Sequence, residues 1–293
     1  MERTLHRRLT SILGAAALGL LAACGTSSSS SSSSSGGATS SGGAADLSGC
    51  QGTITVATDF PLTGGDATDG PFTELAARLA VTQAQNSKLL GGCTLKYTSK
   101  DDSSVAKNGH DPAQGAQNIT ALAADNSVLG VVGPFNSSVA LAEIPVATQN
   151  HLALISPSNT NPCLTAVVAV CSDPTINIPT ASLYKGSHSY FRVIASDVQQ
   201  GDILGYIAAH ELNLTKAYVI DDQEAYGRGL ALLFEKAYQA DGGSVVGNAS
   251  LPGKTTTYAT QLSDAKSAGA QVIFFGGTTG NGCGLVRRDM ATA

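Results

Sequence analysis

The sequence predicts an α/β protein built on parallel sheets with helices on both faces. Short apolar runs alternate with longer helix-like segments from about residue 50 to about residue 275, and this repeated strand–helix–strand spacing is typical of a parallel sheet. The chain also has no Trp, 5% aromatic residues and 33 Gly among 293 residues, which suits a plain α/β protein. We expect two such sheets, divided near residues 194–197.

The first half of the folded part contains five strand-like runs and three helix-like segments. The expected strands are 53–58, 95–98, 128–132, 152–155 and 190–194. The expected helices are 73–86, 114–125 and 139–149. A Pro-, Thr- and Ser-rich segment at 164–188 resembles an insertion.

The second half repeats the pattern. The expected helices are 199–211, 229–240 and 258–268, and the expected strands are 217–220, 244–246 and 272–275. A cleft between two α/β lobes is a common place for a small-molecule site. We therefore expect the ligand, if there is one, to lie between the two sheets.

Two hydroxyl-rich loops follow neighbouring predicted strands, at 133–138 and at 156–162. Ligands of open parallel sheets bind at the carboxyl ends of the strands, so these loops predict a small-molecule site. We expect Ser137, Ser138, Ser158 and Thr160 to present their hydroxyls to the ligand, because hydroxyls and unpaired amides at the start of a helix suit a carboxylate. The alternative is that Ser137 or Ser138 only caps the helix predicted from residue 139.

The first residues are typical of an export signal. Arg3, Arg7 and Arg8 precede an apolar run at 12–23, which is too short for a membrane-spanning helix. The Arg7–Arg8 pair leaves twin-arginine and ordinary export both open. Residues 21–25 resemble a bacterial lipobox, which implies cleavage after residue 23 and lipid attachment to Cys24; the alternative is an ordinary secretory peptide with a chance cysteine.

Residues 24–48 are expected to form a disordered tether. They include nine consecutive serines and cannot bury apolar surface. Export permits disulfides, and we expect the pairs Cys50–Cys93, whose cysteines precede two strands, and Cys163–Cys171, which bracket a short loop. Metal binding is the competing interpretation, but no Cys or His spacing supports it. Cys283 has no evident partner.

Several function classes are disfavoured. The net charge is −5 without a basic stripe, so we expect no nucleic-acid partner. The pairs Asp101–Asp102 and Asp221–Asp222 point apart on a strand, and are expected to end strands and cap helices rather than act as acid/base pairs. The segment 276–284 matches no nucleotide-binding spacing and is expected to be cleft-lining or linker backbone. We expect no catalysis, no metal and no cofactor.

Six segments together resemble the substrate-binding proteins of bacterial branched-chain amino acid importers, which are type I periplasmic binding proteins. The segments are TVATDFPLTG at 55–64, GPFNSSVALA at 133–142, LISPSNTNP at 154–162, FR at 191–192 with DVQQG at 197–201, VIDDQEAYGRGLA at 219–231 and VIFFGG at 272–277. The resemblance implies two Rossmann-like lobes, here 49–194 and 195–293, that close on a ligand without catalysis. It implies ligand contacts from Ser137, from Ser158 and Thr160, and from Tyr226 in the opposite lobe.

The chain also departs from that family. Thr278 stands where an aromatic often follows the Gly-Gly pair, and we expect it to contact the ligand in that place. The aromatic of the first loop is not evident near Asp69. The acidic residue that meets the ligand ammonium would lie beyond residue 293, so we expect an incomplete second lobe and weak or no binding by the chain as given.

The resemblance implies an amino acid or related small amide as ligand. It also implies a lipid anchor at the outer face of the cell membrane and an ABC permease as partner. An exported sensor domain and an α/β hydrolase are the alternatives. The absence of a nucleophile–base motif disfavours the hydrolase.

Overall fold

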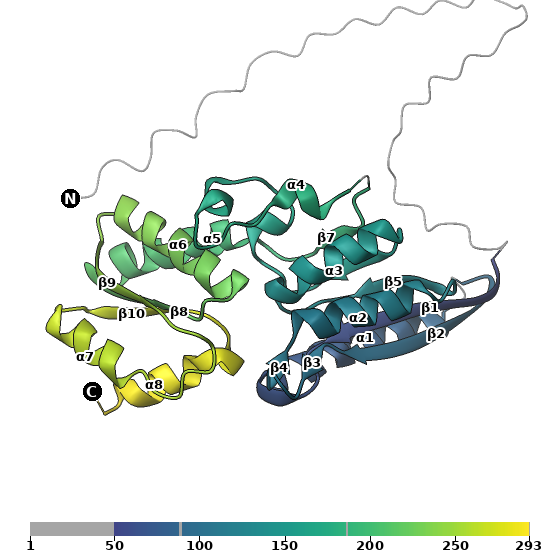
Figure 1. Cartoon of the computed structure of the whole chain (residues 1–293), viewed down its shortest axis with the longest axis horizontal. Coiled ribbons are helices and arrows are strands. Elements are labelled where there is room, and N and C mark those ends of the chain that lie inside the picture. The colour runs from purple at the N-terminus through teal and green to yellow at the C-terminus, as the bar shows by residue number, and fades with distance from the viewer. Residues whose placement is uncertain (1–49, 88–89, 186, 293) are drawn as a thin grey trace, which may run out of the picture. The chain divides into compact units, whose positions relative to one another are not determined.

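The computed structural model describes residues 50–87, 90–185 and 187–292. In this part the chain forms two parallel sheets, with strand orders β2-β1-β5-β6-β7 and β10-β8-β9 (Figure 1). The α/β class is therefore confirmed. Within the described ranges no helix combines the length and apolarity needed to cross a membrane. The expected signal at 1–23, the tether at 24–48 and the lipidation of Cys24 lie outside the described residues.

All five predicted strands of the first sheet are present and pair in parallel. They are β1 (Gln51–Phe60), β2 (Gly92–Asp101), β5 (Val128–Val132), β6 (Ala153–Ser156) and β7 (Tyr190–Arg192). A two-residue antiparallel pair, β3 (Ser103–Ser104) and β4 (Gly109–His110), follows β2. We call this sheet and its helices the first lobe.

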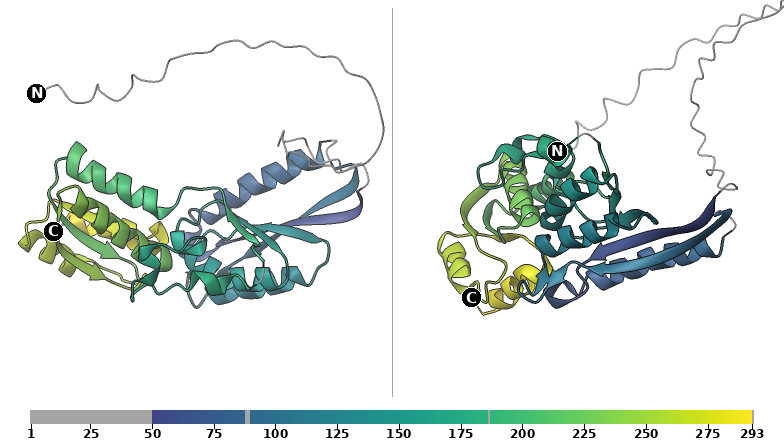
Figure 2. Two further views of the ribbon diagram at one scale, coloured as in Figure 1. Left: turned by 90° about the horizontal axis from the view of Figure 1, so that it is seen from above. Right: turned by 45° about the vertical axis from the view of Figure 1, so that its right-hand side comes forward.

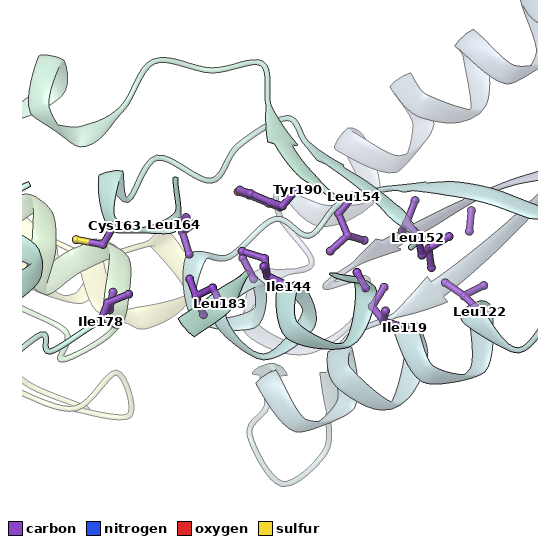
Figure 3. Close-up of a cluster of buried hydrophobic side chains, with 14 of the residues drawn as sticks. Ile119, Leu122, Ile144, Leu152, Leu154, Cys163, Leu164, Ile178, Leu183 and Tyr190 are labelled. Carbon is purple, nitrogen blue, oxygen red and sulfur yellow. The ribbon is translucent and has the colours of Figure 1, made fainter. Parts of the chain in front are cut away.

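Helices cover both faces of the first sheet. They are α1 (Gly70–Gln85), α2 (Pro112–Ala123), α3 (Ser137–Gln149) and the short α4 (Thr180–Leu183). Helices α2 and α3 pack together on one face, and α1 lies on the other (Figure 2). Ile119, Ile144 and Leu154 come from α2, α3 and β6 and are fully buried in one apolar core (Figure 3). Burial of side chains this large stabilises the lobe by roughly 2 kcal/mol each.

The second sheet, with its helices, is called the second lobe. Its strands are β8 (Lys216–Asp221), β9 (Ser244–Ser250) and β10 (Val272–Gly276), and its helices are α5 (Asp197–Tyr206), α6 (Ala225–Ala240), α7 (Ala259–Ser267) and α8 (Gly284–Met290). Successive side chains of the central strand β8 point to opposite faces of the sheet, and both faces are covered by helices. Ala217 and Val219 pack with α6, whereas Tyr218 and Ile220 pack with α7 and α8.

Three parts of the second lobe differ from the sequence predictions. Helix α6 begins at Ala225, four residues before its predicted start. The prediction treated Gly227 as a helix breaker, whereas Gly227 lies inside the helix at a place with no room for a side chain. A Cβ there would collide with the carboxyl of Asp222 and the backbone of Gly276. The predicted helix 199–211 is α5 followed by a wider π turn at Ile207–Glu211. Residues 276–284 are not simple linker backbone, since a π turn at Thr279–Cys283 leads directly into α8.

The structure joins the same two cysteine pairs that the sequence suggests, Cys50–Cys93 and Cys163–Cys171, and leaves Cys283 as a free thiol. The predicted capping role of the two carboxylate pairs is wrong. Asp101 and Asp221 do end β2 and β8. However, Asp111 caps α2 by accepting a hydrogen bond from the Ala113 amide, and the N-cap of α6 is Glu224. Both helices start several residues beyond the strand ends, so the paired carboxylates are not at the cap positions.

Candidate functional site

A cavity of about 310 Å³ lies among the loops that follow the strands of both sheets. Its walls come from the segments after β1, β5, β6, β8 and β10, the carboxyl edge at which parallel sheets bind ligands. The lining residues are Asp69, Phe135, Asn136, Ser137, Ser158, Thr160, Tyr226, Gly277, Thr278, Thr279 and Cys283. The structure therefore brings loops that lie up to about 200 residues apart in sequence to one small space.

Most of the residues expected to contact a ligand line this cavity. The predicted residues that line it are Ser137, Ser158, Thr160, Tyr226 and Thr278. Ser138 does not line it. Its hydroxyl lies near Glu224 instead. His110 has the larger effect in holding the pKa of Glu224 below its usual range, and the Ser138 hydroxyl lowers it further.

Helix α3 presents an uncapped N-terminus at the cavity wall. It begins at Ser137, and the side chain of its N-cap, Asn136, makes no capping hydrogen bond. The interpretation that Ser137 or Ser138 is itself the cap is therefore wrong, because both belong to the helix. The first backbone N–H groups of a helix have no partner within it and carry partial positive charge. This end of the cavity suits an anion.

The loop after β6 is held rigidly against the loop after β5. Ser156 Oγ donates to the carbonyl of Pro134 and accepts hydrogen bonds from the amides of Ser158 and Asn159. Ser158 Oγ and Asn159 Nδ2 both donate to the carbonyl of Phe135, at 2.9 and 2.7 Å. These bonds hold Ser158 against the loop that precedes Ser137. A site ordered in advance lowers the entropy cost of binding a ligand.

Two hydroxyls of the cavity have unused hydrogen-bonding capacity. Thr160 Oγ1 and Thr278 Oγ1 are buried and form no hydrogen bond with any residue of the described ranges. The Thr160 hydroxyl nevertheless lies near Asp197, and it acts to lower the pKa of that carboxyl against the larger, raising effect of burial. Tyr226 OH accepts a 3.3 Å hydrogen bond from Gln200 Nε2 and can still donate. A polar ligand would supply the missing partners, since buried polar groups are rarely left unpaired.

The charges around the cavity are acidic but partly suppressed. Asp69, half-buried, is on the wall, and no Lys, Arg or His is among the described lining residues. Asp197 and Asp222 lie behind the wall, and burial raises the pKa of Asp197 to about 7 and that of Asp222 to about 6. Their repulsion of an anionic ligand is correspondingly reduced.

Six lining residues were not among the predicted contacts: Asp69, Phe135, Asn136, Gly277, Thr279 and Cys283. Phe135 and Asn136 belong to the same loop as Ser137, and Gly277–Thr279 with Cys283 fall in the segment expected to line a cleft or form a linker. Asp69 carried no sequence signal beyond its place after the first strand.

A larger cavity of about 670 Å³ lies near β4. Its acidic groups already have a partner, because His110 Nδ1 is 2.8 Å from Asp66 Oδ2 and His110 Nε2 is 3.8 Å from Glu224 Oε2. The smaller cavity, with its unpaired hydroxyls and helix start, is the better candidate for a ligand.

Most of the chain matches one family of known proteins. Residues 53–288 match the family described as periplasmic binding protein. The chain belongs to this family. As a periplasmic binding protein it is 27% identical over 245 residues to the Leu/Ile/Val-binding protein homolog 3 of Brucella melitensis, an alignment that covers 82% of this chain and 58% of the relative. It therefore spans a little over half the length of the curated relatives that it matches.

Solved structures of periplasmic binding proteins share the fold. One is the branched-chain amino acid transporter substrate binding protein LivJ from Streptococcus pneumoniae, in complex with isoleucine, with a TM-score of 0.60 and 24% identity over 75% of this chain and 56% of that one. Another is an ABC transporter solute binding protein from Rhodopseudomonas palustris, in complex with 3,4-dihydroxy benzoic acid, with a TM-score of 0.63 and 21% identity over 82% of this chain and 58% of that one.

Proposed function

We propose that this chain is the ligand-binding part of a solute-binding protein of an ABC importer, and that it captures an amino acid in the 310 Å³ cavity. The observation that carries the proposal is the uncapped start of α3 beside the unpaired hydroxyl of Thr160. A carboxylate placed there meets backbone N–H groups, the Ser137 hydroxyl and the Thr160 hydroxyl. This donor set recognises a carboxylate without any cationic side chain.

The rest of the cavity supplies contacts from the second lobe. Tyr226 and Thr278 follow β8 and β10, and Asp69 offers a carboxylate to a ligand ammonium. A ligand held between both lobes would favour the closed arrangement by its differential contacts. The chain would then act as a capture device rather than a catalyst.

The relatives support a class of ligand, the carboxylates, more strongly than they support any single compound. Proteins similar to this chain carry Leu/Ile/Val-binding names, and one solved structure holds isoleucine. Others hold 4-hydroxybenzoate or 3,4-dihydroxy benzoic acid. All of these ligands share a carboxylate, and an aromatic acid is accordingly the second candidate.

The proposal extends to location and partners. The family name implies a place outside the cytoplasm. We infer that residues 1–23 direct export, that Cys24 carries a lipid anchor and that residues 24–48 tether the ligand-binding lobes 49–194 and 195–293. A membrane permease of the ABC class would receive the solute, which passes to it when the lobes open.

Calorimetry with leucine, isoleucine, valine and 3,4-dihydroxybenzoate tests the function. We expect Ser137→Ala and Thr160→Ala each to weaken binding of the preferred ligand about ten-fold or more, because each removes a hydrogen bond to a charged group. Ser138→Ala is the matched control: it removes the neighbouring hydroxyl, which does not line the cavity, and should keep wild-type affinity. Wild-type affinity in both test variants would contradict the proposal. Weak binding by the wild type would not, since the sequence already leads us to expect it.

A further inference from the structure

Three acidic side chains from distant parts of the sequence meet inside the first lobe. Asp59 lies near the end of β1, Asp102 follows β2 and Glu143 lies in the middle of α3. One oxygen from each lies within 4.8 Å of the other two. All three side chains have an exposed fraction of 0%. Acidic residues are almost never fully buried without a partner.

The carboxyl oxygens of this cluster are almost all unpaired. Asp59 Oδ1 accepts a 2.9 Å hydrogen bond from Asn118 Nδ2. Asp59 Oδ2 and both oxygens of Glu143 have no hydrogen-bond partner in residues 50–87, 90–185 and 187–292. None of the three carboxyls forms an ion pair with a Lys, Arg or His of these ranges.

Asp102 is a separate observation, because it comes from a loop that belongs to neither β1 nor α3. Its carboxyl is fully buried, both of its oxygens are unpaired, and it is directed at the pair formed by Asp59 and Glu143. An isolated buried carboxylate costs several kcal/mol. His110, a nearby cation, pairs with Asp66 and Glu224 and not with Asp102. A third acid at this point therefore indicates a further positively charged partner.

Three ionised carboxylates at this spacing, shut off from water, repel one another strongly. Asp59 and Glu143 can hydrogen-bond to each other only if one of them holds a proton, since ionised carboxylates only accept. Without a counter-ion, the cluster is neutral only when protonated.

We propose that Asp59, Asp102 and Glu143 bind a calcium ion. Ca²⁺ takes carboxylate oxygens at about 2.3–2.6 Å, so two ligand atoms on one ion lie at most about 5 Å apart. The spacing in the cluster satisfies this limit. Mg²⁺ requires near-ideal octahedral geometry and keeps several waters, which a fully buried site accommodates less readily. A single divalent ion would give one oxygen of each carboxyl a positively charged partner.

The ion would link the cluster to the cavity wall. Glu143 is six residues after Ser137, the first residue of α3, and six helical residues rise about 9 Å. An ion held by Glu143, Asp59 and Asp102 would fasten α3 to the ends of β1 and β2. The position of the helix start, and with it the candidate anion site, would then be fixed by calcium.

The test is calorimetric titration of EDTA-treated full chain with CaCl₂, together with thermal unfolding. We expect one calcium per chain, with a Kd between micromolar and millimolar. We also expect Tm to rise by roughly 5 °C when calcium exceeds Kd a hundred-fold. Asp102→Asn and Glu143→Gln keep the side-chain shape, and each should weaken calcium binding at least ten-fold and abolish the Tm rise.

Asp202→Asn, on the exposed surface of α5, is the matched control and should bind calcium as the wild type does. Three results would overturn the proposal. One is the absence of both calcium binding and a Tm response in the wild type, which needs no variant to fold. The second is selective binding of Mg²⁺. The third is unchanged calcium binding in the two amide variants. If instead calcium has no effect on the wild type and the amide variants are more stable than it, the cluster holds protons and not a metal ion.

Discussion

His110 connects acidic groups of both lobes. Its Nδ1 pairs with Asp66 of the first lobe, and its Nε2 lies 3.8 Å from Glu224 at the start of α6 in the second. Burial alone would lower the pKa of His110, but Asp66 and Glu224 outweigh it and raise the pKa to about 10. His110 is therefore a cation throughout the physiological range. The 3.8 Å between His110 Nε2 and Glu224 Oε2 is too long for a hydrogen bond, so this contact is an ion pair only.

Glu224→Gln should lower the free energy of unfolding by about 0.5 kcal/mol at pH 7, because Glu224 is partly exposed and its ion pair is screened. His110, Ser138 and Lys107 all act to lower its pKa. A lowered carboxyl pKa stabilises the fold above the unfolded value, about 4.5, and the benefit is lost as pH falls through the folded value. Urea unfolding should show a difference at pH 7 that disappears near pH 3. An equal difference at both values would mean that the contact is not electrostatic.

Sequence reasoning located the cavity hydroxyls but not the buried acids, and the reason is sequence distance. Ser137, Ser158 and Thr160 follow predicted strands directly, so the strand pattern also places them at one edge of the sheet. Asp59 and Glu143 each look like ordinary polar positions in a strand and a helix. Only the packing of α3 against β1 brings them together, and no local pattern records that packing.

Helices α5 and α6 pack unusually closely, and two glycines on α5 make this possible. A Cβ on Gly201 would lie 2.9 Å from the backbone and Cβ of Leu233, and a Cβ on Gly205 would lie 2.8 Å from the amide nitrogen of Tyr238. These neighbours are mostly backbone atoms of α6 and cannot turn aside. The close contact positions α6, whose first turn carries Tyr226, relative to the rest of the lobe.

Gly205→Ala should destabilise the protein by about 1–3 kcal/mol through overpacking, although alanine is the better helix former. Gly284→Ala, in α8, is the matched substitution, since no atom lies within 4 Å of a Cβ built there. It should stabilise the protein by about 0.5 kcal/mol. Chemical denaturation of both variants gives the comparison. Equal effects of the same sign would show that helix propensity, and not packing, dominates at Gly205.

Element boundaries were harder to predict than elements. Apolar periodicity indicated β8 and most of α6, but the glycines in the first turn of α6 conceal its start because glycine disfavours helix. Helix α8 was missed for the same reason, since it follows the Gly-rich turn that precedes Gly284 and is only seven residues long. In both places tertiary packing outweighs local propensity.

The two disulfides constrain very different lengths of chain. Cys50–Cys93 closes a loop with a sequence separation of 43, whereas Cys163–Cys171 closes one of 8. In the chain-entropy description, the bonds stabilise the fold by about 4 and about 2.5 kcal/mol, respectively, because a longer loop loses more freedom in the unfolded chain. The longer loop includes all of β1 and α1.

Reduction of paired variants should separate these contributions. In Cys163→Ala/Cys171→Ala only the long loop remains, so dithiothreitol should lower its free energy of unfolding by about 4 kcal/mol. In Cys50→Ala/Cys93→Ala the loss on reduction should be about 2.5 kcal/mol. Urea unfolding of each variant with and without reductant gives both differences and cancels the effect of the alanines. The reverse order would show that the bonds act through the folded state.

The architecture of the molecule was the most predictable property. Alternating strands and helices require parallel sheets with right-handed crossovers, so the α/β class and the ligand edge follow from the pattern alone. The order β2-β1-β5-β6-β7 and the meeting of the two sheets depend on long-range packing, and one sequence carries little record of it.

Cys50 directly precedes β1, and the cavity lies beyond the other end of that strand. A ten-residue strand spans roughly 33 Å. The chain that precedes Cys50 therefore joins the first lobe at the edge remote from the ligand. The Cys50–Cys93 disulfide and the cavity therefore lie at opposite ends of the first lobe, so the bond braces β1 at the end that the ligand loops leave free.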